Sequence, residues 1–133
     1  MVWAGPCSSW IRILDIFISM DIDIFVPGHG PLGTKDDVRD ARDILIFIME
    51  AGHKAYAAGI RDPVEAAYQI VVPEKWKHYG EQERVVMNMC TFWKEVDPGY
   101  KTPEFFELMC IAGEYHRHIN KVRYQNGHVR SLI

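Results

Sequence analysis

Residues 27–33 of this chain read P-G-H-G-P-L-G, with two prolines and three glycines in seven positions. Proline lacks a backbone donor and fixes φ, and glycine loses the most conformational entropy on ordering, so this segment cannot belong to a regular element. The glycines on both sides of His29 also permit a sharp turn that brings its imidazole into a cleft. The segment therefore predicts a structural break with a histidine at its centre.

The residues before the break predict a helix followed by a strand. Between residues 10 and 20, apolar side chains recur at spacings of three and four, which is typical of an amphipathic helix. Ile22, Ile24 and Val26 then recur at every second position, and Pro27 ends the run. This alternation predicts a short strand that delivers the chain to the turn.

The residues after the break predict a long helix. Thr34 is a candidate N-cap, and Asp36 and Asp37 complement the positive end of a helix dipole. The apolar stripe that follows consists of Val38, Ala41, Leu45 and Ile48. We expect the wholly apolar run at residues 44–49 to be the buried part of this helix.

Beyond residue 60 the chain is predicted to be wholly helical. Asp62 precedes Pro63, which pairs an N-cap with proline at the first helical position. Residues 81–96 are predicted to form a second helix with one apolar stripe, made of Val85, Met89, Phe92 and Val96. A short linker separates it from a third helix that begins after Pro103, which predicts an antiparallel αα-hairpin. The predicted seam of the last helix consists of Phe105, Leu108, Ala112, Tyr115, Ile119 and Val122.

Composition limits the class of protein. The 133 residues hold 15 Lys and Arg against 18 Asp and Glu, a net charge of −3 that offers no general attraction for nucleic acid. No apolar run approaches the ~20 residues of a membrane span, and the first twenty residues lack the basic region of a signal peptide. The three cysteines are far apart and form no C-x-x-C pair, as expected for reduced thiols. We expect a cytoplasmic protein that binds neither nucleic acid nor a membrane.

Residues 21–38, D-I-D-I-F-V-P-G-H-G-P-L-G-T-K-D-D-V, resemble the C-terminal metal-ligand segment of metallo-β-lactamase-fold hydrolases. In that superfamily a strand, a P-G-H-G-P turn and a capped helix follow one another, and a weaker similarity extends back to Val2. The resemblance implies the C-terminal part of an αββα fold. We thus expect a mostly helical α+β protein in which residues 1–60, with one clear strand, are followed by a helical extension at residues 61–133 that packs on them.

The resemblance also implies a role for the histidine of the turn. In the superfamily this residue is a ligand to the second of two metal ions, so His29 is the implied metal ligand here. Neutral imidazole suits zinc and similar divalent metals. A dinuclear centre of that kind lowers the pKa of bound water and polarises an ester, amide or phosphoester substrate.

The superfamily's main signature, H-x-H-x-D-H, and its bridging aspartate are absent from the chain. We therefore expect the C-terminal segment of a metal-dependent hydrolase that is inactive alone, with no catalytic residue of its own. The missing N-terminal part of the fold, or a second copy of the chain, is the expected partner. The alternative is a non-catalytic helical interaction or dimerisation module, in which the turn is a relic. Such a hydrolase segment would be a truncated reading frame, a fragment or one half of a split gene.

Other residues gave weaker signals. His116 and His118 form an H-x-H, but residues two apart on a helix point to nearly opposite faces, which favours a solvated helix end. Cys90 and Cys110 lie beside apolar stripes and are predicted to be packed thiols. The remaining histidines are expected at the surface, at the edge of the core or near the terminus: His53, His78 and His128.

Overall fold

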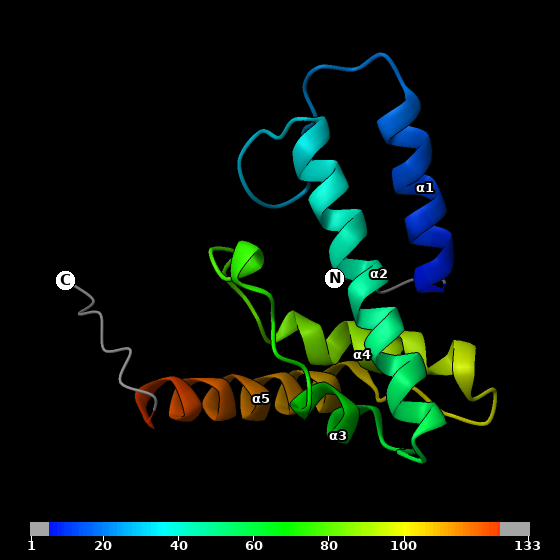
Figure 1. Cartoon of the computed structure of the whole chain (residues 1–133), viewed down its shortest axis with the longest axis vertical. Coiled ribbons are helices and arrows are strands. Elements are labelled where there is room, and N and C mark those ends of the chain that lie inside the picture. Colours follow the sequence, from blue (N-terminus) through cyan, green and yellow to red (C-terminus); the bar gives the residue numbers. More distant parts are fainter. Residues whose placement is uncertain (1–5, 126–133) are drawn as a thin grey trace.

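A computed structural model describes residues 6–125 of the protein, with the backbone alone for residues 122–125. The described chain is helical, and Figure 1 shows how its elements are arranged. In chain order they are α1 (Cys7–Ser19), α2 (Lys35–Ala57), α3 (Pro63–Tyr68), the 3₁₀ turn η1 (Glu74–Trp76), α4 (Arg84–Val96) and α5 (Phe105–Gln125). No helix within residues 6–125 is both long enough and apolar enough to cross a bilayer.

Helices α2 and α3 begin where the sequence places caps. At the start of α2, the backbone N–H and the hydroxyl of Thr34 both donate to the carboxylate of Asp37, at 2.7 and 2.9 Å. At the start of α3, the side chain of Asp62 accepts a hydrogen bond from the backbone of Val64 at 2.9 Å. These bonds satisfy polar groups that a helix end otherwise leaves unpaired.

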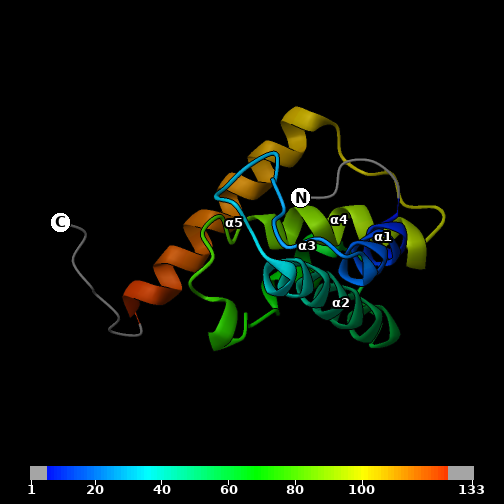
Figure 2. The ribbon, with the colours of Figure 1, turned by 90° about the horizontal axis from the view of Figure 1, so that it is seen from above.

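Helix α4 is the centre of the molecule. It packs against α1, α2, α3 and α5, and Figure 2 shows it between α2 and α5. Met89, Cys90, Phe92 and Trp93 are completely buried. The apolar stripe predicted within residues 81–96 is confirmed at Met89 and Phe92, but α4 is buried around most of its circumference and not along one stripe alone.

Helices α4 and α5 run in opposite directions and pack together, which confirms the predicted hairpin (Figure 1). Leu108, Ala112 and Tyr115 are buried on the inner face of α5. The hydroxyl of Tyr115 donates to the carbonyl of Ala67 at 3.2 Å and so joins α5 to α3. The predicted seam is wrong at Phe105, which is 51% exposed because the first turn of α5 starts at the edge of the core.

The prediction of an α+β fold with a strand at residues 22–26 is wrong. Within the described residues this segment has one isolated bridge, between Phe25 and Gly33, with N···O distances of 2.8 and 2.9 Å. The side chains of Ile24 and Val26 are 63% and 80% exposed. Alternating apolar residues form a strand only where a neighbouring segment pairs with them through a ladder of hydrogen bonds. Within residues 6–125, this segment pairs with no residue other than Gly33.

Candidate functional site

The P-G-H-G-P segment forms a closed loop whose base is fixed on both sides. The bridge between Phe25 and Gly33 closes it, and the ring of Phe25 lies 6.4 Å from the ring of Phe17 on α1. On the other side Gly33 leads into the Thr34 cap of α2. The loop is therefore anchored to both helices of the α1–α2 pair, above the body of the molecule in Figure 1.

His29 lies in the exposed part of this loop. The next residue, Gly30, has φ +99°, a left-handed conformation that side chains other than glycine's adopt with difficulty. Among the described residues there is no group of three or more His, Cys, Asp or Glu side chains that could hold a metal ion. The loop thus presents an imidazole that belongs to no cluster of three ligating side chains in this part of the chain.

The acidic residues that follow the loop are engaged at the start of α2. Asp37 accepts the two hydrogen bonds from Thr34, and these bonds lower the pKa of its carboxyl group. Asp36 forms an ion pair with Arg39 at 2.6 Å. Both carboxylates therefore serve α2, in agreement with their predicted role as helix-start residues.

The other histidines make separate contacts. Nδ1 of His116 lies 3.2 Å from a carboxylate oxygen of Glu83, whereas the ring of His118 packs edge-on against Tyr68 at 4.7 Å. The two members of the H-x-H thus have different partners. His53 packs against Phe92 and His78 against Tyr79, while His128 lies outside the described residues.

The cysteines differ from one another. Burial raises the pKa of Cys7 to about 12 and that of Cys90 to about 11, so both thiols stay protonated and unreactive at neutral pH. Packing of Cys90 was predicted correctly. Cys110 is exposed on α5, so its predicted packing is wrong: it lies beside the buried stripe and not within it.

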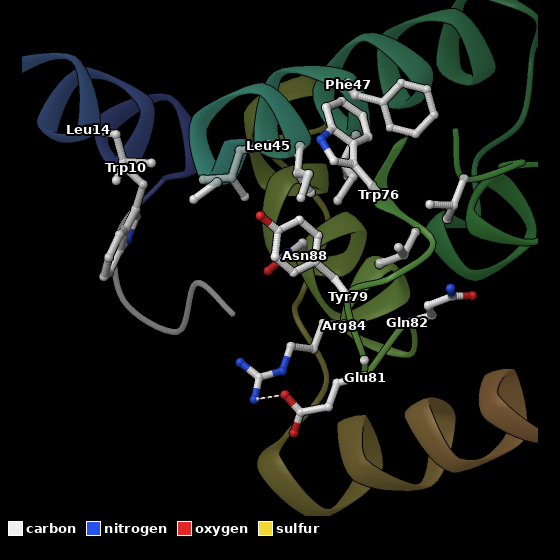
Figure 3. A pocket seen from close by; sticks show the side chains of 16 residues that line it. Trp10, Leu14, Leu45, Phe47, Trp76, Tyr79, Glu81, Gln82, Arg84 and Asn88 are labelled. Atoms are coloured by element: carbon white, nitrogen blue, oxygen red, sulfur yellow. Dashed lines mark ion pairs between the residues drawn. The ribbon is translucent and has the colours of Figure 1, made fainter. Parts of the chain in front are cut away.

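A second candidate site is a cleft of about 390 Å³ between α1, α2, α4 and the segment that joins η1 to α4. Figure 3 shows Trp10 and Leu14 at one end and Phe47 and Trp76 at the other. Its further lining residues include Leu45, Ile48, Tyr79, Glu81, Gln82, Arg84, Val85 and Asn88. The walls are therefore mainly apolar and aromatic, with polar groups gathered near the start of α4.

Asp40 of α2 holds one wall of this cleft in place. Its carboxylate accepts hydrogen bonds from Nε1 of Trp76 at 3.3 Å and from the hydroxyl of Tyr79 at 3.1 Å. Burial, and then the hydrogen bond to Asp40, raises the pKa of Tyr79, so its hydroxyl stays protonated at neutral pH and keeps donating. The ring of Phe47 lies 5.6 Å from that of Trp76 and completes the wall.

Sequence reasoning missed this cleft because its residues come from four separate segments and form no motif. The available signal was weak: two aromatic residues, Trp76 and Tyr79, stand three apart in a segment opened by Pro73. Comparisons of the chain with protein-family models, with curated proteins and with solved structures found no match.

Proposed function

We propose that this chain is the C-terminal segment of a metal-dependent hydrolase of the metallo-β-lactamase superfamily, and that His29 is one ligand of its dinuclear centre. The observation that carries the proposal is the P-G-H-G-P loop itself. It is closed at its base, exposes His29 and leads directly into a capped helix. A loop fixed on rigid elements suits a ligand that must be held in one position.

The outer surface of α1 supports the proposal. Trp10, Ile13 and Phe17 lie at helical spacing and are exposed to water. The neighbouring loop adds three apolar side chains that are each more than half exposed, namely Ile24, Val26 and Leu32. Exposed apolar residues gathered in this part of the molecule favour a surface that another polypeptide covers. The proposed cover is the part of the hydrolase that carries the remaining metal ligands.

The described residues do not complete a metal site. They hold no cluster of three ligating side chains, and the carboxylates of Asp36 and Asp37 are engaged by Arg39 and Thr34. One imidazole falls short of the three or four protein ligands that zinc sites use. In this proposal the chain by itself binds zinc or another divalent metal weakly and hydrolyses no ester, amide or phosphoester.

The coding sequence around this chain provides the test. We expect an in-frame H-x-H-x-D-H upstream of Met1, or an adjacent reading frame that ends just after the bridging aspartate. When that segment is co-expressed with the chain, His29→Ala should lower the metal content of the purified complex, and Phe106→Ala should leave it unchanged. Absence of the signature from both places would overturn the proposal.

The second candidate function is a helical interaction or dimerisation module in which the loop is a relic. The exposed apolar residues of α1 favour it as well, since they fit a protein partner with no metal. This function predicts that the purified chain forms a defined dimer, and that His29→Ala changes neither its assembly nor the metal content of any complex it forms.

A further inference from the structure

We propose that the cleft beside Asp40 binds a small, uncharged, ring-containing molecule. The cleft's volume of about 390 Å³ lies at the lower end of the roughly 300–1,000 Å³ typical of small-molecule sites. Its lining does not include His29, so the inference is independent of the proposed hydrolase function.

The shape of the cleft favours a small molecule over a protein segment. α1, α2 and the segment after η1 enclose it from different sides, and Figure 3 shows the side chains of these elements converging on one space. Of the exposed apolar residues on α1, Trp10 lines the cleft, whereas Ile13 and Phe17 do not. The broad apolar surface of α1 and the cleft are thus distinct features that meet at Trp10.

The charges at the cleft argue for an uncharged ligand. Glu81 and Arg84 are the charged residues of its lining, and they form an ion pair with each other, drawn as a dashed line in Figure 3. The nearby carboxylate of Asp40 accepts two hydrogen bonds from the wall. An ionic ligand would lose its hydration without gaining an unpaired partner, which is costly in an apolar site.

The uncharged groups define the rest of the ligand's chemistry. Trp10, Phe47 and Trp76 offer aromatic surface, against which a planar ring packs favourably. Because Asp40 holds Trp76 and Tyr79 in place, the wall is already formed before a ligand arrives.

The test compares two probes of nearly the same shape, 2-naphthamide and the anion 2-naphthoate, by calorimetric titration of the full chain. We expect 2-naphthamide to bind at least tenfold more tightly. Trp10→Ala removes one wall at an exposed helix position and should weaken that binding at least fivefold. Phe106→Ala, which removes an exposed aromatic ring outside the cleft, should not change it. In the NMR spectrum, the indole N–H signals of Trp10 and Trp76 should shift on binding.

Several results would overturn the inference. These are no binding of 2-naphthamide, equal binding of the two probes, or unchanged binding to the Trp10→Ala variant. A dimer that Trp10→Ala dissociates, in a chain that does not bind 2-naphthamide, would instead assign the cleft to a second copy.

Discussion

Residues 6–34 and the α3–α5 region follow the same rules of apolar spacing but reach different degrees of burial. α4 buries most of its circumference, and α5 buries Leu108, Ala112 and Tyr115 on one face. In α1, by contrast, Cys7 is the one buried residue, and Trp10, Ile13 and Phe17 face water. This difference shows that amphipathic spacing determines where a helix forms, whereas the burial of its apolar face depends on the segments that pack against it.

The largest expected effect comes from a substitution in the well-packed α3–α5 region. Leu108→Asp places a charge among the buried residues of α5 and should destabilise the chain by more than about 3 kcal/mol, enough to lose much of its helical circular dichroism. Phe106→Asp, two residues away on the same helix and 82% exposed, should change stability by less than about 0.5 kcal/mol. Equal effects of the two substitutions would show that the inner face of α5 is wrongly assigned.

Two glycines within helices give a smaller, paired effect. A Cβ at Gly52 would lie 2.5 Å from Cε1 of Phe92, so Gly52→Ala should destabilise the chain by about 1–3 kcal/mol. A Cβ at Gly113 meets nothing within 4 Å, so Gly113→Ala should stabilise it by about 0.5–1 kcal/mol. Urea denaturation measures both changes, and a stabilising Gly52→Ala would contradict the close approach of α2 and α4.

The apolar surface of α1 should affect association more than stability. Because this surface is exposed, we expect the wild-type chain to form oligomers in size-exclusion chromatography with light scattering. Ile13→Asp should reduce this association while changing the free energy of unfolding by less than about 1 kcal/mol. Phe106→Asp, which removes an exposed apolar side chain elsewhere, should leave the association unchanged. A monomeric wild-type chain would show that the exposed apolar residues of α1 do not cause association.

The smallest expected effect is on the pH dependence of stability, and it comes from the cap at the start of α2. The hydrogen bonds from Thr34 lower the pKa of Asp37 in the folded chain. This stabilisation is complete above the unfolded pKa of about 4 and is lost as the pH falls through the lower folded value. Thermal unfolding between pH 5 and 2 should therefore show a steeper loss of stability in the wild type than in Asp37→Asn. Parallel curves would show that the cap does not contribute.

The helices could be predicted from the sequence because their signals are local. Thr34 and Asp62 mark helix starts, and the spacing of Leu108 and Ala112 marks a buried face. The strand at residues 22–26 could not be judged locally, since pairing depends on a distant segment. The central position of α4 was also beyond prediction, because its stripe looks like that of any helix packed on one side.

The two candidate sites also differ in how far they could be predicted from the sequence. His29 was found because its loop is a contiguous motif of prolines and glycines, which constrains the backbone by itself. The cleft was missed because Trp10, Trp76 and Tyr79 come together only when α1, α2 and the segment after η1 pack. Such a site exists only in the tertiary structure.

Calorimetric titration of the full chain with zinc tests the central claim, that His29 is one ligand of an incomplete metal centre. A complete four-ligand site yields roughly 10–16 kcal/mol, and one imidazole at a quarter of this gives on the order of 3–4 kcal/mol, or roughly millimolar affinity. The wild type and His29→Ala should therefore both bind zinc with no better than roughly millimolar affinity. A micromolar zinc site that His29→Ala abolishes would contradict the claim, since the chain would then complete the centre by itself.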